Sequence, residues 1–212
     1  MEIKNVVVSA ASIENGDKIP DLVFATGAAG YTYMYSQSRK FFNAFVRKSW
    51  LTPKSYFSCT NTTVACTEDG VIGMEIGFSG VDWYEFKKIG ADIVRSLIEK
   101  GEATIEQARH LGVAAYKNYF QLPYVPPDAY YILAIANKLE VRGKGIGKLL
   151  LENAFLQAKE SEYRTLHLDV YSDNPAVQFY ESMGMTCMAE TSCPELYRDH
   201  GIPMEKRMVI RL

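Results

Sequence analysis

The sequence predicts an α/β fold built around a parallel strand–helix–strand unit, and three observations support this prediction. An apolar run over 130–136 is followed by a glycine-rich turn over 142–147. Beyond the turn, apolar residues recur at helical spacing as far as residue 158, as expected of an amphipathic helix. An alternating run over 165–171 supplies the next strand, and a strand, helix and strand at this spacing form a right-handed parallel unit.

Further strands and helices are predicted on both sides of this unit. Apolar or alternating runs predict strands over 3–10, 62–67, 71–78, 185–191 and 204–212. Helical periodicity predicts a helix over 17–26, an aromatic-rich helical stretch over 31–50, and two helices packed as a hairpin over 83–120. The chain therefore alternates between the two types of element along most of its length.

The predicted strand over 71–78 follows a hairpin turn at Glu68-Asp69-Gly70 and presents two faces. One face is expected to hold Ile72, Met74, Ile76 and Phe78, and the other Val71, Gly73, Glu75 and Gly77. A glutamate between two glycines on a sheet face can meet a cationic amine or act as a base. It can equally be a solvated strand residue, and both interpretations of Glu75 stay open.

Length and composition are those of one ordinary globular domain spanning residues 1–212. Apolar residues make up 48% of the chain and charged residues 23%, with a net charge of −2. Such a balance argues against binding to nucleic acid or to a membrane surface. The first residues lack the basic and apolar regions of a signal peptide, and no apolar run has the length of a membrane span, so a cytoplasmic location is expected.

The four cysteines do not form a metal-binding or redox motif. Cys59, Cys66, Cys187 and Cys193 include no C-x-x-C pair, and no histidine lies at zinc-ligand spacing from them. Reduced, partly buried thiols are therefore favoured over a disulfide, and no metal is expected.

The turn over 142–148 has the features of a phosphate-binding loop. Glycines let the backbone pass close to a phosphate, and the free N–H groups at the start of the following helix attract an anion. Positive charge comes from Arg142, Lys144 and Lys148. A phosphate or pyrophosphate is therefore the predicted ligand.

Two common nucleotide-binding motifs are excluded at this turn. A Walker A loop needs a glycine where Arg142 stands and a serine or threonine where Leu149 stands. The dinucleotide fingerprint needs a third glycine where Lys148 stands. What remains is an Arg-x-x-Gly-x-Gly pattern formed by Arg142, Gly145 and Gly147.

A second motif lies after the strand over 165–171. Asp173 or Asn174 can cap a helix that has Pro175 in its first turn and Gly184 at its end. Together with the Arg-x-x-Gly-x-Gly turn, the segment holding Asn174, Ala176, Phe179, Tyr180 and Gly184 resembles the acyl-CoA-binding half of the GNAT superfamily of N-acyltransferases. Met185 stands where phenylalanine is more usual in that family.

The resemblance implies a GNAT-like mixed central sheet of about six to seven strands flanked by helices, with a parallel βαβ acyl-CoA-binding core. The helices around 82–121 form an insertion placed either over the sheet or against the acceptor pocket, and both placements stay open. The first two helices would flank the acceptor entrance. The loop between the last two strands, which contains 198–203, would border the acceptor side.

The resemblance also assigns residues to the co-substrate, acetyl-CoA. A bulged end of the central strand, Ile135-Ala136-Asn137, would hold the pantetheine arm, with the backbone N–H of Asn137 directed at the acyl carbonyl. Asn137 departs from the valine that often occupies this position. The pyrophosphate would bind at the loop formed by Arg142, Gly143, Lys144, Gly145, Ile146, Gly147 and Lys148, and Asn174 would hydrogen-bond the pantetheine region.

Tyr180 is the residue to which the resemblance gives a catalytic role. In the family this tyrosine donates a proton or a hydrogen bond to the departing CoA sulfur. Reference pKa values of about 10 for tyrosine and about 8.5 for a thiol make the hydrogen bond the more conservative assignment. A core-packing role remains the alternative, since Tyr180 shares a helical face with Ala176 and Met183.

The predicted activity is direct transfer of an acetyl group from acetyl-CoA to a primary amine. The acceptor is a small molecule or a peptide, a homodimer is compatible with the resemblance, and no general base is selected among Glu75, Glu85, Asp128 and Asp169. One alternative is a non-catalytic acyl-CoA-binding sensor or interaction module without a productive acceptor pocket. A second alternative, an unrelated α/β nucleotide-binding protein, is disfavoured by the two failed motif tests.

Overall fold

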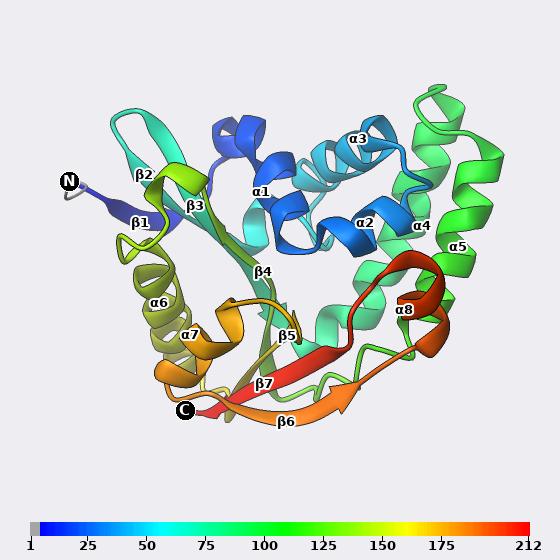
Figure 1. Ribbon diagram of the computed structural model, residues 1–212. Helices are drawn as coiled ribbons and strands as arrows, with labels where there is room; N and C mark the ends of the chain where they lie inside the picture. The colour runs from blue at the N-terminus through cyan, green and yellow to red at the C-terminus, as the bar shows by residue number, and fades with distance from the viewer. Residues whose placement is uncertain (1–4) are drawn as a thin grey trace.

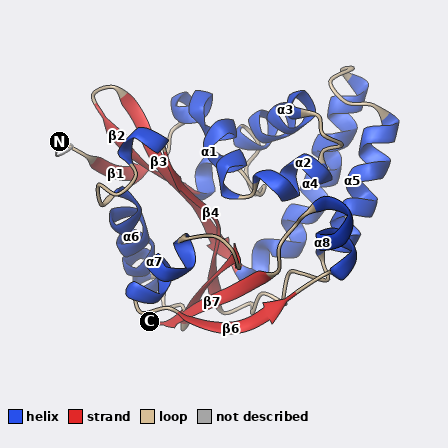
Figure 2. Ribbon diagram, in the orientation of Figure 1, coloured by secondary structure: helices blue, strands red, loops and turns tan. Residues whose placement is uncertain are grey.

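The computed structural model describes residues 5–212, and one mixed sheet organises them (Figures 1 and 2). The sheet consists of β1 (Val7–Ala10), β2 (Thr62–Thr67), β3 (Gly70–Ser79), β4 (Ala129–Asn137), β5 (Thr165–Tyr171), β6 (Thr186–Thr191) and β7 (Glu205–Arg211). Its strand order is β1-β2-β3-β4-β5-β7-β6. Among the strands that the structure describes, only β4 and β5 pair in parallel. The predicted α/β class, strand number and parallel central unit are confirmed.

Helices cover both faces of the sheet. They are α1 (Ile19–Thr26), α2 (Ala28–Met34), α3 (Arg39–Trp50), α4 (Trp83–Glu99), α5 (Ile105–Asn118), α6 (Ile146–Glu160), α7 (Ala176–Ser182) and α8 (Pro194–His200). Short 3-10 turns lie at Ile13–Lys18, Cys59–Asn61, Gly80–Asp82 and Leu139–Val141. In Figure 1, α6 and α7 lie on one side of β4 and β5, whereas α1 to α5 lie on the other.

A separate apolar core joins each helical layer to the sheet. Phe41, Phe42 and Phe45 of α3, in the aromatic-rich stretch predicted over 31–50, pack with Met74 and Ile76 of β3. On the other side, the core between α6, α7 and β5 consists of Leu151, Ala154, Leu166, Leu168, Val170 and Tyr180 with their neighbours. These cores fix both helical layers against the strands that carry the site.

Ile72 does not share a face with Met74 and Ile76, and this prediction was wrong. Cys66 pairs with Val71 whereas Ala65 pairs with Gly73, so Ile72 is an extra residue that bulges out of the ladder. A bulge reverses the alternation of side chains on either side of it. Ile72 consequently packs with Ile146 and Leu150 of α6, on the face opposite to Met74.

The segment between β6 and β7 is a helix, not the loop that was predicted. Pro194 in the first turn of α8 and Gly201 after its end, with φ +64°, are typical helix boundary residues. His200 packs on Tyr33 of α2 rather than at the main cavity, with ring centroids 4.1 Å apart. At the other end of the chain, the first strand begins at Val7, and Ile3 and Lys4 lie outside the described residues.

The central feature of the fold is the divergence of β4 and β5. The two strands pair only from Ala129↔Thr165 to Ile132↔Leu168, although β4 continues to Asn137 and β5 to Tyr171. Opposite β3, the β4 register shifts between Ile132 and Ala134, so the β4 bulge lies at Leu133. The expected bulge is therefore present, but two residues before Ile135-Ala136-Asn137. Backbone groups of β4 that face β5 beyond Ile132 are left without a ladder partner.

Three further properties of the described residues concern disulfides, metal sites and membrane-spanning helices. All four cysteines are free thiols. Across residues 5–212, no cluster of three or more His, Cys, Asp or Glu side chains is arranged to hold a metal ion. None of the helices in this range combines the length and the apolar character needed to cross a membrane.

Candidate active site

A continuous cavity of about 1310 Å³ passes through the opening between β4 and β5. On one side it is lined by the glycine turn and by α7, including Arg142, Asn174 and Tyr180. On the other side it is lined by α2, α4 and α5. One space thus connects the predicted acyl-CoA half of the molecule with the N-terminal helices.

The glycine turn has the backbone conformation of an anion-binding loop. Gly143 and Gly145 have φ angles of +72° and +83°, which favour glycine, and α6 begins immediately afterwards at Ile146. Within residues 5–212, the amide N–H groups of Gly145, Ile146 and Lys148 have no acceptor. Free amides at the start of a helix attract phosphate.

The three cations of the turn are not equivalent. Lys144 donates to the carbonyl of Glu140 at 2.7 Å, and Lys148 lies 3.7 Å from Glu152. The exposed guanidinium of Arg142 has no such partner among the described residues and lines the cavity. Arg142 is therefore the cation best placed for a ligand.

Asn137 connects the end of β4 to the start of α6. With its amide oriented to satisfy both neighbours, the side-chain oxygen accepts from the Gly147 N–H at 3.2 Å and the side-chain nitrogen donates to the Ala136 carbonyl at 3.2 Å. Asn137 consequently occupies one amide of the turn and fixes the distance between strand and loop. Ile135, Ala136 and Asn137 all line the cavity.

Asn174 lies directly before Pro175, the N-cap residue of α7, and its side chain binds the first turn of the helix. Its side-chain oxygen accepts from the Ala176 N–H at 2.9 Å, and its backbone carbonyl accepts from the Val177 N–H at 3.1 Å. At the other end of α7, Gly184 has a φ of +86° and the Met185 N–H returns to the Tyr180 carbonyl. Since its oxygen is used as a cap, the Asn174 amide nitrogen is the group that remains for a ligand.

Tyr180 is buried in the core between α7 and β5 and also borders the cavity. It is 6% exposed, and burial raises the pKa of its phenol well above the ordinary value. The hydroxyl has no hydrogen-bond partner within residues 5–212. Tyr180 thus combines the predicted packing role with a protonated hydroxyl available to the cavity.

The carboxylates that the sequence suggested as bases lie in different environments. Glu75 is fully buried, its pKa is raised to about 8 by burial, and it accepts from the Tyr130 hydroxyl at 3.2 Å, but it does not line the cavity. Glu85 is exposed 3.9 Å from Lys54, and Asp128 is exposed outside the cavity. Neither the amine-binding nor the solvated interpretation of Glu75 describes this buried acid.

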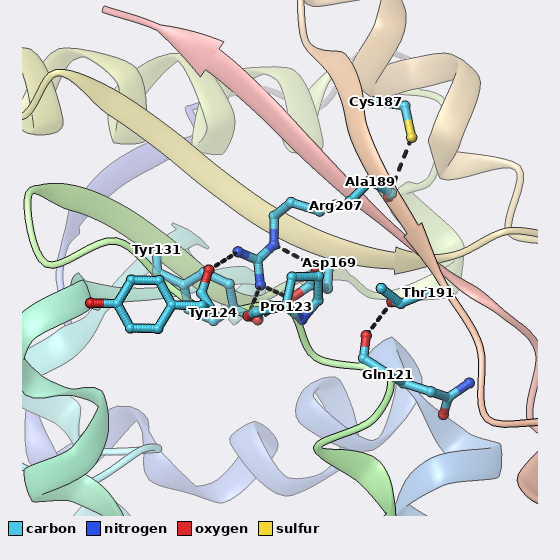
Figure 3. Close-up of polar contacts among 9 residues, drawn as sticks. All are labelled: Gln121, Pro123, Tyr124, Tyr131, Asp169, Cys187, Ala189, Thr191 and Arg207. Atoms are coloured by element: carbon cyan, nitrogen blue, oxygen red, sulfur yellow. Dashed lines mark hydrogen bonds and ion pairs between the residues drawn. The ribbon is translucent and has the colours of Figure 1, made fainter.

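Asp169 lines the cavity but is held by other protein groups (Figure 3). Arg207 binds it through two nitrogens at 2.6 and 2.7 Å, and the Tyr131 hydroxyl donates to it at 2.8 Å. The fully buried guanidinium of Arg207 also donates to the carbonyls of Pro123 and Tyr124. With its oxygens occupied in this way, Asp169 serves to position neighbouring elements.

Glu205 is a cavity residue that the sequence analysis missed. It lies at the start of β7, is 8% exposed, and one of its carboxylate oxygens is buried without a hydrogen-bond partner among residues 5–212. Burial, and then the nearby charge of Asp169, raise its pKa to about 8. The alternation of Glu205 and Arg207 on one face of a predicted strand was the signal available, because charged residues rarely repeat on a buried face.

The helical insertion forms one wall of the cavity. Lys87, Gly90 and Val94 of α4 line it, together with Leu111 and Ala115 of α5. Thr104 starts α5 with a capping box, and α4 and α5 are the two helices predicted for this segment. The N-terminal helices contribute Tyr31 and other side chains to the cavity wall.

Comparison with known proteins identifies this architecture. The Acetyltransferase (GNAT) family matches residues 83–185. No curated protein sequence matches the chain significantly.

Many solved structures share the fold. An N-acetyltransferase from Staphylococcus aureus Mu50 has a TM-score of 0.71 at 17% identity, covering 96% of this chain and 100% of its own. A structure described as an acetyltransferase has a TM-score of 0.70 at 19% identity, with coverage of 97% and 98%. The NatC complex bound to Gag peptide and CoA has a TM-score of 0.50 at 16% identity, with coverage of 100% and 99%.

The family match includes the glycine turn, the divergent strands β4 and β5, and the helix that carries Tyr180. The seven-stranded sheet with its single parallel pair agrees with the shared fold. Residues 83–185 therefore carry an acetyltransferase domain of the GNAT family, whose members are acyltransferases.

Proposed function

We propose that the protein transfers an acetyl group from acetyl-CoA to a primary amine by direct attack of the amine on the thioester. The observation that supports this most is the single cavity that joins the glycine turn to a chamber between α2, α4 and α5. A donor bound at the turn and an acceptor bound in the chamber can meet between β4 and β5. A sensor that only binds acyl-CoA has no need for the second half of this space.

In the proposed complex, the chain's own groups hold the donor at two places. The free amides at the start of α6 and the guanidinium of Arg142 bind the pyrophosphate through hydrogen bonds and charge. The unpaired backbone edge of β4, over Ile135, Ala136 and Asn137, binds the pantetheine arm, assisted by the Asn174 amide nitrogen. A backbone N–H beyond the bulge donates to the acyl oxygen as its negative charge develops.

Direct transfer is favoured over a covalent enzyme intermediate by the composition of the cavity wall. Among the described residues, the wall contains no serine and no cysteine that could accept the acyl group. The amine nitrogen therefore attacks the acyl carbon, and the sulfur leaves. The protonated phenol of Tyr180 donates a hydrogen bond to the leaving sulfur, and its raised pKa makes full transfer of the phenol proton unfavourable.

Substitution of the catalytic tyrosine tests this proposal. In Tyr180→Phe, kcat is expected to fall at least tenfold, since a hydrogen bond to the leaving thiolate is lost. The dissociation constant of acetyl-CoA should stay within twofold of wild type, because the ring keeps its place in the core. The measurement is free thiol release with a panel of amines, with calorimetric titration for binding. Unchanged turnover would remove Tyr180 from the mechanism.

Tyr163→Phe is the matched control for this experiment. Tyr163 packs against the same core as Tyr180 but does not line the cavity. Its loss of a hydroxyl should leave turnover unaffected. Binding of acetyl-CoA by the wild type without thiol release for any amine would favour the sensor hypothesis.

Arg142→Ala tests the pyrophosphate site. Arg142 is the turn cation without a protein partner among the described residues, so its removal should raise the dissociation constant of CoA about tenfold, which corresponds to about 1.4 kcal/mol. Calorimetric titration with CoA measures the change, and Lys159→Ala at the far end of α6 is the control. Equal affinities for the two variants would contradict the assignment.

A further inference from the structure

The chamber on the α4–α5 side of the cavity has a wall with many aromatic side chains. Tyr31 of α2, Trp83 of α4, Tyr131 of β4 and Tyr171 of β5 face it, together with Tyr56 and Tyr119. Several of these rings pack against one another edge to face, as Trp83 does with Tyr56 and with Tyr131. A wall of this kind offers large, rigid apolar surfaces that suit a flat apolar group.

One unpaired acid lies within this aromatic wall. Glu205 is buried between β5 and β6 at the start of β7, opposite Tyr171, and one of its oxygens has no protein partner. An unsatisfied carboxyl at such a depth is costly unless a ligand supplies the missing hydrogen bond. The missing partner is therefore a donor that enters through the cavity.

The other charged groups of the cavity define how many cationic centres the acceptor can carry. Asp169 is neutralised by Arg207, and Asp173 is exposed on the loop before α7. Lys87 lies over the ring of Tyr119 at 4.6 Å and adds positive charge to this side. A polyamine or an aminoglycoside needs several acids or other polar groups to bind its amines. Among the described residues, the chamber buries one acid without a protein partner, Glu205.

We propose that the acceptor is a monoamine carried on a flat apolar or aromatic body, with its nitrogen bound at Glu205 and its body against the aromatic wall. This inference rests on the proposed acetyl transfer and specifies its second substrate. Glu205 is then a catalytic residue in the strict sense, because it touches the reacting nitrogen.

The proton balance follows from this placement. Glu205 acts in its ionised form, which is the minor form in the ligand-free protein below about pH 8 and is favoured by the positive charge of an entering ammonium. The carboxylate takes one proton from the amine, which leaves the nitrogen lone pair free. A carbon–nitrogen bond forms as the carbon–sulfur bond breaks, and the second proton lost by the nitrogen ends on the CoA thiolate. A carboxyl whose pKa is about 8 holds the first proton better than an ordinary glutamate, and that proton later returns to solvent.

Binding and turnover with 2-phenylethylamine test the inference on the full chain. We expect calorimetric titration of the CoA complex to show that 2-phenylethylamine binds at least tenfold more tightly than spermidine, kanamycin or a dipeptide. In Glu205→Gln, affinity for 2-phenylethylamine should fall at least tenfold and kcat/KM about a hundredfold. Affinity for CoA should not change, which shows that the variant is folded. Glu85→Gln, at an exposed acid outside the cavity, is the matched control and should behave as wild type.

The outcomes separate this inference from the proposed function. If spermidine or a peptide is acetylated more efficiently than 2-phenylethylamine, or if Glu205→Gln retains wild-type kcat/KM, the acceptor assignment is wrong and acetyl transfer stands. If no amine releases thiol although acetyl-CoA binds, acetyl transfer itself is wrong. Phenylethanol, which lacks the charge of the amine, should bind weakly, and with the same affinity to wild type and to Glu205→Gln. If wild type binds phenylethanol as tightly as 2-phenylethylamine, the role of Glu205 is also wrong.

Discussion

Arg207→Met is expected to destabilise the protein by about 3–5 kcal/mol, because it leaves the buried carboxylate of Asp169 without its counter-ion. Arg207 is fully buried, and its guanidinium also holds the carbonyls of Pro123 and Tyr124. All of these groups lose their partner together. For a chain of this size the melting temperature should fall by about 10 °C, as differential scanning calorimetry would measure.

Two further variants show whether the buried charge is the cause. The double variant Arg207→Met with Asp169→Leu removes both charges and should recover a large part of the lost stability. Arg95→Met removes the cation of an exposed pair, 2.8 Å from Asp92, and should cost less than about 1 kcal/mol. A melting temperature of Arg207→Met equal to that of Arg95→Met would contradict the role given to this ion pair.

Stability should fall as pH rises between about 6.5 and 8. Glu75 and Glu205 each have a folded pKa of about 8, above the ordinary value of 4.5, so the folded chain binds more protons than the unfolded chain in this interval. Each carboxyl then lowers the free energy of unfolding by about 1.4 kcal/mol per pH unit, until it ionises in the folded state near pH 8. Urea unfolding at several pH values measures the slope.

Below pH 6.5 the free energy of unfolding should change less steeply with pH. Burial, and then the charge of Arg207, lower the pKa of His167 from 6.5 to about 4, so the unfolded chain binds the extra proton there. His167 therefore raises the free energy of unfolding as pH rises between about 4 and 6.5. This slope is opposite in sign to the slope that each glutamate contributes, and it cancels one of the two. Glu75→Gln, which keeps the shape of a buried acid that does not line the cavity, should remove about half of the slope above pH 6.5. An unchanged slope would show that Glu75 is ionised in the folded protein.

Features set by local sequence were predictable. Glycine at positive φ fixes the turn before α6, and Asn174 and Gly184 bound α7 as their residue types indicate. The same local signals located the two helices of the insertion. The helix α8 also carries such signals, in Pro194 and Gly201, and its omission was an error of interpretation rather than a lack of information.

Features set by the pairing of distant segments were not predictable. The bulge at Ile72 depends on the register between β2 and β3, which alternation within one strand does not reveal. The insertion became a wall of the cavity because α4 and α5 pack on the face opposite to α6. Glu205 reached the cavity because β7 inserts between β5 and β6, and that strand order is a property of the whole sheet.

The contacts between the segment after α5 and the last strand have a consequence for the order of folding. Arg207 and Pro203 bind Pro123, Tyr124 and Gln121 across 82 to 84 positions of the chain. Contacts over such separations carry a large loop-closure cost and form late. The acceptor chamber therefore closes only after β7 has joined the sheet. Met208 of β7 also packs in the core with Leu168 and Tyr180, so the acyl-CoA half depends on the same strand and neither half of the cavity is complete until β7 has joined.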